Sequence, residues 1–239
     1  MILHTVQPEE VDVFGYLKPS DLLRHCTASC SEQNAADGCD EAIHRIVAVT
    51  GWMIARFCMT QSAPIRTGEK LVLRCSPRSI DGAVYIRRVR VHRDDVEVAC
   101  CDFAWTLVDM ENRRILRAKE IDRQLELSEP IELPSVPRLP REKDLPELAR
   151  QTISLAVCDA NGHYSSANYV DMLCDAFDFW GNGERLMRKL QIEYKSEFMP
   201  GEELILSGRI TESGVSAHGT HSDGRSGFTA HFVTEEIAV

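Results

Sequence analysis

Two stretches of the chain carry apolar residues at the spacing of one helix face. The clearer stretch is expected to start at a Ser165 or Ser166 cap and to end at Gly181. Its apolar face consists of Tyr169, Met172, Leu173, Ala176, Phe177 and Trp180. The other helix is expected to begin near Ser20 and to end by Gly38. Its apolar face consists of Leu22, Leu23, Cys26 and Cys30.

Each predicted helix is followed by segments with the composition of β-strands. These segments are 84–91 and 96–108 after the first helix, and 203–210 and 227–233 after the second. A helix followed by antiparallel strands, twice, favours an α+β fold. We expect two central helices, each wrapped by an antiparallel sheet, with the two sheets joined edge to edge so that open edges are covered.

The chain also contains weak internal repetition. The run that begins at Asp12 aligns with the run that begins at Asp159, and the stretch 67–73 mirrors 200–206 in the same order. Duplication of one supersecondary unit is therefore the favoured interpretation. The division that follows is a first unit at 1–116, a linker at 117–148 and a second unit at 149–239. Four prolines in the 11 residues 130–140 make that linker an extended connector.

Composition narrows the function classes. The 239 residues have a formal net charge of −10, which disfavours a general nucleic-acid binder. No apolar stretch reaches the roughly 18 residues needed to span a bilayer, and no secretory signal is evident, so a cytoplasmic location without stable membrane insertion is expected. The nine cysteines form no Cys-x-x-Cys pair, and buried reduced thiols explain them better than disulfides or zinc.

The most informative polar residues are Asp159, Asn161 and His163, which occupy alternate positions just before the second predicted helix. A helix start exposes unpaired backbone N–H groups and attracts negative charge. A reaction that develops an oxyanion could use such a site. The first copy of the run has Phe14 and Tyr16 in place of the amide and the imidazole, so only the second copy carries these polar groups.

Two stretches resemble the acyl–acyl carrier protein thioesterases of the bacterial type, which have a double hotdog fold. The first is Phe103-Ala104-Trp105-x-Leu107-x-Asp109-x-x-x-Arg113-Arg114, and the second is Asp159-x-Asn161-Gly162-His163-x-x-x-x-x-Tyr169. The resemblance extends over nearly the whole chain. It implies a tandem hotdog and an enzyme that releases free fatty acid from acyl–acyl carrier protein.

Carried over residue by residue, the resemblance implies four catalytic residues: Asp159, Asn161, His163 and Glu197. Glu197 is expected on the strand after the second helix, where the family often has Glu followed by Cys. Phe198 stands at that Cys position, which argues against a cysteine nucleophile. The base is left open between the two carboxylates, as is direct carboxylate attack. Taken singly, each residue is more often a cap, a turn residue or a solvated side chain.

Backbone N–H groups near the start of the second helix are candidate oxyanion donors, namely those of Gly162, Tyr164 and Ser165. The resemblance further implies that the first unit accommodates the acyl chain and is not itself catalytic. Candidate pocket residues are Trp52, Met53, Ile54, Phe57 and Met59, for each of which a plain core role is at least as frequent.

Acyl carrier protein is acidic, so a local basic surface is expected to dock it. One candidate group is Arg113, Arg114 and Arg117, and another is Arg185, Arg188 and Lys189. The second group is expected to lie nearer the catalytic residues. Solvated surface charge is the alternative for each.

No metal or cofactor is expected, because His163 has no second ligand at zinc spacing and no nucleotide fingerprint is present. A homodimer is left open. Two other functions stay open: acyl-CoA hydrolysis on the same fold, and non-catalytic acyl binding.

Overall fold

The computed structural model of the protein describes residues 1–45, 47, 49–112, 114–123, 129–140, 142–181 and 184–237. Its first half contains two short helices, one long helix, one 3-10 turn and seven strands. In chain order these are β1 (Ile2–Thr5), η1 (Pro8–Glu10), α1 (Pro19–Ala36), α2 (Cys39–His44), β2 (Thr50–Gln61), β3 (Lys70–Cys75), β4 (Ser79–Asp81), β5 (Val84–Arg93), β6 (Val96–Asp109), β7 (Arg114–Leu116) and α3 (Ala118–Asp122).

The second half repeats the pattern with fewer elements. They are β8 (Glu147–Thr152), η2 (Leu155–Val157), α4 (Ser166–Ala176), β9 (Arg185–Tyr194), β10 (Glu203–Thr211), β11 (Gly214–His221) and β12 (Ser226–Glu236). Within the described ranges, no helix is both long and apolar enough to cross a membrane.

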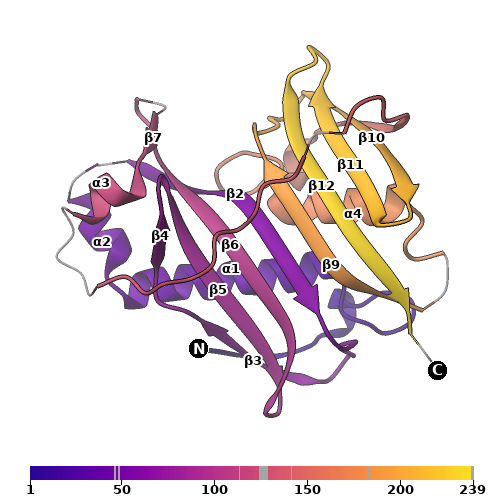
Figure 1. Cartoon of the computed structure of the whole chain (residues 1–239), viewed down its shortest axis with the longest axis horizontal. Helices are drawn as coiled ribbons and strands as arrows, with labels where there is room; N and C mark the ends of the chain where they lie inside the picture. The colour runs from indigo at the N-terminus through magenta and orange to yellow at the C-terminus, as the bar shows by residue number, and fades with distance from the viewer. Residues whose placement is uncertain are drawn as a thin grey trace.

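One antiparallel sheet runs through both halves in the order β1-β3-β5-β6-β2-β9-β12-β11-β10-β8, with β4 on β5 and β7 on β6. The halves join where β2 pairs with β9, and the centre of that seam is the pair Cys58 and Gln191. The expected edge-to-edge union of two sheets is therefore confirmed. Figure 1 shows the sheet curving in front of α1 and α4.

The long helices lie against the inner face of the sheet. Leu22, Leu23 and Cys26 of α1 and Val170 and Leu173 of α4 are at most 1% exposed and belong to one continuous core. This burial of one apolar helix stripe is what makes each helix form in the chain. The helices also contact each other: Arg24 reaches Asn168 and Asp171 of α4 at 2.8 and 3.1 Å.

The second helix is shorter than its apolar pattern predicts. It ends at Ala176 instead of near Gly181, and Phe179 and Trp180 lie in the turns that follow. Asp178 has a φ of 50°, in the left-handed region that a continuing helix does not use. The apolar residues past the helix end still pack on the core, which is why their periodicity looked helical.

The proline-rich segment lies along the outer face of the sheet and crosses the seam, as Figure 1 shows. Arg56 of β2 donates to the Val136 carbonyl at 2.8 Å, and Gln191 of β9 donates to the Pro137 carbonyl at 2.7 Å. The extended connector is thus bonded to both halves. Val136 is 3% exposed and closes a small cluster on that face.

Candidate functional site

The run from Asp159 to His163 forms a tight turn that precedes α4. The Asp159 N–H donates to the His163 carbonyl at 2.8 Å, and the Gly162 N–H donates to the Asp159 carbonyl at 3.0 Å. Asp159 Oδ1 accepts the N–H groups of Asn161 at 2.8 Å and His163 at 3.3 Å. Gly162 has a φ of 78°, a conformation that glycine adopts without steric cost. The side chain of Asn161 is exposed on this turn, and that of His163 is partly buried.

His163 and Glu197 meet in this structure. His163 Nε2 lies 3.2 Å from Glu197 Oε2, and the two side chains are 14% and 39% exposed. The contact joins residues 34 positions apart in the chain. Glu197 lies three residues beyond the end of β9, in the connection to β10, and not on the strand itself as expected. A loop position lets its carboxylate turn back toward α4.

Two side chains hold the Glu197 loop in place. Ser196 Oγ lies 2.8 Å from His221 Nε2, and the Phe198 ring stacks on the His221 ring with centroids 3.9 Å apart. The Tyr164 N–H donates to the Phe198 carbonyl at 2.9 Å, which ties the loop to the turn. Phe198 itself is fully buried. Phe198 therefore anchors the loop by packing.

Ser196, His221 and Glu202 look superficially like a serine-nucleophile triad, but the bonding opposes that role. Arg225 can only donate, and its guanidinium lies 3.3 Å from His221 Nδ1, so Nδ1 is the acceptor nitrogen. Nε2 then carries the proton and donates to Ser196 Oγ, whose own proton goes to the Ser226 carbonyl at 2.9 Å. Burial lowers the pKa of His221, and the charge of Arg225 adds to the effect. Ser196 is thus a hydrogen-bonded loop residue.

The three predicted oxyanion donors already have acceptors. Besides the Gly162 and Tyr164 bonds, the Ser165 N–H donates to the Val157 carbonyl at 3.3 Å. They cannot serve an oxyanion without breaking these bonds. The first two N–H groups of α4, those of Ser166 and Ala167, precede the first intrahelical bond, and the described residues supply no acceptor for them. The candidate oxyanion donors are therefore the N–H groups of Ser166 and Ala167, in the first turn of α4.

The candidate pocket residues on β2 divide into two groups. Phe57 and Met59 are fully buried in the core, whereas Met53 and Ile54 are partly exposed. Trp52 borders a narrow depression of the first half, together with Tyr85, Trp105, Arg78 and Arg87. Trp52 also donates to Asp40 at 2.9 Å.

Tyr194 connects the site with this strand. Its hydroxyl donates to the Ser166 carbonyl at 3.0 Å, and the preceding residue, Glu193, pairs with Arg56 of β2. Tyr194, Ile54 and Trp52 all pack against the same core. The start of α4 and the inner face of β2 therefore border one region of the molecule.

The two cationic groups lie at opposite ends of the sheet. Arg185 and Arg188 are near the start of the ten-residue strand β9, and about 30 Å of strand separates Arg185 from the end of β9 that leads to Glu197. Both are also engaged by carboxylates, Arg188 with Glu235 at 2.5 Å and Arg185 with Glu236 at 3.9 Å. Lys189, the next residue, is exposed. β9 therefore carries Arg185 away from the Glu197 loop.

Arg114 and Arg117 are exposed at the other end, and Arg113 lies outside the described residues. Arg114 pairs with Asp109, and Asp109 pairs with Thr50 at the start of β2. Since β2 and β9 are antiparallel, the start of β2 lies at the end of the sheet where β9 leads to Glu197.

Tyr194, Ser196 and His221 were missed by sequence reasoning. Ser196 adjoins Glu197, which was a usable signal. His221 and Tyr194 act through contacts across 25 and 28 positions, and no local pattern marks them. Among the described residues, neither His163 nor Glu197 belongs to a cluster of three metal-ligating side chains.

Solved structures of the same fold cover almost the entire chain. An acyl-ACP thioesterase from Bacteroides thetaiotaomicron has a TM-score of 0.79 at 17% identity, covering 98% of this chain and 96% of that chain. A 12:0-ACP thioesterase from Umbellularia californica has a TM-score of 0.77 at 14% identity, with coverages of 98% and 96%. At these identities the likeness shows the fold, which is the double hotdog. No curated protein matches the sequence significantly.

A family model described as the acyl-ACP thioesterase N-terminal domain matches residues 3–124, just over half of the chain. The chain therefore belongs to the acyl–acyl carrier protein thioesterase family. It is an enzyme that hydrolyses acyl–acyl carrier protein thioesters, as the resemblance implied.

Proposed function

We propose that the pair of His163 and Glu197 carries the thioester hydrolysis, within a catalytic second unit at 149–239. The observation that supports this is the 3.2 Å contact between His163 Nε2 and Glu197 Oε2. The contact brings together an acid–base side chain and a carboxylate that is 39% exposed and so open to water. Asp159 and Asn161 complete the proposed set from the same turn.

Glu197 is the proposed base, and Asp159 the proposed support of the turn. Asp159 Oδ1 is occupied by two backbone N–H groups. Asp12 makes the same two bonds in the first half, where no imidazole follows. The role of Asp159 in holding the turn is therefore sufficient to explain why an aspartate stands at this position. Among the residues that the structure describes, the Glu197 carboxylate makes no hydrogen bond or ion pair other than the contact with His163.

In the proposed reaction a water oxygen attacks the thioester carbonyl carbon while Glu197 takes the water proton. The negative charge that develops on the carbonyl oxygen is bound by the N–H groups of Ser166 and Ala167, with the Asn161 amide as a further donor. When the carbon–sulfur bond breaks, the proton passes to the sulfur, by way of the His163 and Glu197 pair. The products are the free fatty acid and the carrier thiol.

The first unit, 1–116, is the proposed holder of the acyl chain, with Trp52 and Ile54 on the inner face of β2 as its entry from α4. In this proposal the linker at 117–148 connects the unit that holds the acyl chain to the catalytic unit. Exposed Arg114 and Arg117 are proposed to dock the acidic carrier, since they lie at the Glu197 end of the sheet. Nine cysteines without a disulfide fit a reducing compartment, so we include a cytoplasmic location and fatty acid biosynthesis in the proposal.

The test is steady-state hydrolysis of matched acyl–acyl carrier protein and acyl-CoA thioesters by the wild type and by Glu197→Gln. We expect kcat to fall about 10²–10⁴-fold in the variant while the fold is kept. Glu212→Gln, an exposed glutamate in the turn after β10, is the matched control and should retain full activity. Full activity in Glu197→Gln would overturn the site. A higher kcat/KM for the acyl-CoA thioester would favour the acyl-CoA alternative, and binding without turnover would favour an acyl-binding protein.

Charge reversal at Arg114 and Arg117 to Glu tests the docking surface. KM for the acyl–acyl carrier protein should rise, whereas KM for acyl-CoA should not change. The same reversal at Arg185 and Arg188 is the comparison and should leave both values unaltered. A larger effect from that second pair would contradict the assignment.

A further inference from the structure

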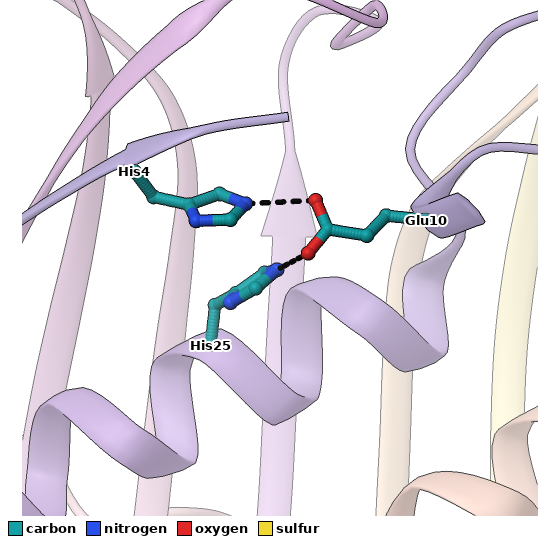
Figure 2. Close-up of side chains that lie close together, drawn as sticks. All are labelled: His4, Glu10 and His25. Carbon is teal, nitrogen blue, oxygen red and sulfur yellow. Dashed lines mark hydrogen bonds and ion pairs between the residues drawn. The ribbon is translucent and has the colours of Figure 1, made fainter. Parts of the chain in front are cut away.

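A second polar cluster lies in the first half, outside the catalytic turn. Three elements contribute one side chain each: His4 from β1, Glu10 from η1 and His25 from α1. Figure 2 shows both imidazoles pointing toward the Glu10 carboxylate. His4 Nε2 lies 2.8 Å from Glu10 Oε2, and His25 Nε2 lies 2.9 Å from Glu10 Oε1. The ligand atoms of all three lie within 4.8 Å of one another.

The geometry is held in advance by other contacts. The Gln7 N–H donates to Glu10 Oε2 at 2.8 Å, which fixes the carboxylate and leaves Oε1 directed at His25. The two imidazole rings stand with centroids 3.8 Å apart, and the Nε2 atom of each lies against the Glu10 carboxylate. Two imidazoles and one carboxylate are the three protein ligands of zinc sites that keep a water as their fourth ligand.

The contact between His25 and Glu10 is not a satisfied hydrogen bond. His25 Nε2 is buried and, within the described ranges, has no partner with hydrogen-bond geometry, although Glu10 Oε1 lies 2.9 Å away. A buried ring nitrogen without a hydrogen bond is costly unless something else binds it. A metal ion placed between the three ligand atoms would supply that partner.

The second half shows that the fold does not require these side chains. The bond from the Lys18 N–H to the Glu10 carbonyl is repeated there by the bond from Ser165 to Val157. By the same repeat, Gln151 stands in place of His4 and Met172 in place of His25. The shared scaffold therefore forms with an amide, a valine and a thioether at these positions.

We propose that His4, Glu10 and His25 bind one divalent transition-metal ion of the zinc type. Zinc bonds of about 2.0–2.1 Å hold ligand atoms roughly 3–4 Å apart, so small side-chain shifts complete the site. The side chains are 14–23% exposed, which leaves access for the ion and for a water as fourth ligand. The ion would tie the edge strand β1 and the turn η1 to the central helix α1. The site does not depend on the proposed catalytic residues.

The experiment uses the untagged full chain, stripped with a chelator and then titrated with Zn²⁺, with bound metal counted by elemental analysis. We expect one Zn²⁺ per chain and a rise in Tm on binding. His25→Gln and Glu10→Gln should each bind Zn²⁺ at least about tenfold more weakly. His44→Gln, an exposed histidine at the end of α2, and His163→Gln are the controls and should bind as the wild type does.

Co²⁺ added to the stripped wild type gives a second readout that needs no variant. A visible spectrum of low coordination number without an intense thiolate-to-metal band supports a histidine and carboxylate site. A thiolate band would place the metal on the cysteines and overturn the proposal. Absence of stoichiometric Zn²⁺ binding, or equal affinity in His25→Gln and His44→Gln, would overturn it as well.

Discussion

The turn at Asp12–Tyr16 and the turn at Asp159–His163 have the same backbone and different chemistry. In each, the aspartate N–H donates to the carbonyl four residues on at 2.8 Å, and the glycine N–H donates to the aspartate carbonyl at 3.0 Å. In each, aspartate Oδ1 accepts two further N–H groups. The aspartate is therefore part of a scaffold that both halves use, and its presence alone does not mark a catalytic site.

The side chains on this scaffold diverge. Where the second half has His163 beside Glu197, the first half has Tyr16, whose hydroxyl donates to Glu184 and accepts from Arg66 at 2.6 Å. The Arg66 guanidinium also lies over the Tyr16 ring, 4.4 Å from its centroid. The loop carbonyl that receives the turn belongs to Ile65 in the first half and to Phe198 in the second. Pro64 thus stands where Glu197 stands. The turn at Asp12–Tyr16 therefore makes a hydrogen-bonded contact between the first and second halves of the molecule.

The largest effect is expected from a variant in which the second turn carries the side chains of the first turn. Asn161→Phe with His163→Tyr should keep the turn, since its bonds are made by Asp159 and the backbone, and should lower kcat about 10²–10⁴-fold. Circular dichroism and Tm establish that the fold is retained. Activity near that of the wild type would mean that the difference between the two turns is not catalytic.

His221 offers a smaller effect through the Glu197 loop. His221→Ala removes the ring on which Phe198 stacks and the partner of Ser196, so Glu197 loses its alignment, and kcat should fall about 10- to 100-fold with KM little changed. His221→Phe keeps a stacked ring and should recover part of that loss. A change in KM alone, with kcat intact, would show that His221 acts on substrate binding instead.

The two turn aspartates should respond alike to the same substitution. Asp159→Asn and Asp12→Asn both keep Oδ1 as an acceptor, so each should change the free energy of unfolding by only about 1 kcal/mol or less, and Asp159→Asn should reduce kcat less than tenfold. Chemical denaturation of both variants, with kcat for each, measures this. A loss of 10² or more confined to Asp159→Asn would make Asp159 the base and refute the assignment of Glu197.

The smallest expected effect concerns pH. In the first half Arg93, which is permanently charged, bonds the Pro64 carbonyl at 3.0 Å, whereas in the second half His221 holds the equivalent loop. Because the folded pKa of His221 is lowered, the unfolded chain takes up a proton near pH 6.5 before the folded chain does. The neutral, buried His221 ring therefore stabilises the folded state fully above about pH 6.5. This stabilisation is lost as the pH falls, because protonation favours the unfolded chain. The His221→Phe variant should therefore lose less stability than the wild type between pH 7 and 5 in denaturant titrations.

The duplicated arrangement of a turn, a helix and strands could be predicted because local sequence patterns specify it. The apolar stripe of α1, the repeated aspartate turn and the helix-then-strands order are all short-range features. Strand registers were not accessible, and they decide where side chains meet. No local pattern shows that Glu197 lies past the end of β9, or that Arg185 lies at the opposite end of that strand. The donors at Gly162, Tyr164 and Ser165 failed for a related reason, since their acceptors lie on other segments or across the turn.

The seam between β2 and β9 has a consequence for how the enzyme responds to dilution. A hotdog pair made of separate chains would fall apart below its dissociation constant, whereas here both partners belong to one covalent chain and the segment bonded to Arg56 and Gln191 crosses their junction. The partner concentration that each half experiences is set by the tether and not by the amount of protein in solution. The pairing of the two halves is accordingly independent of how scarce the protein becomes, and each half is free to mutate without having to fit a copy of itself.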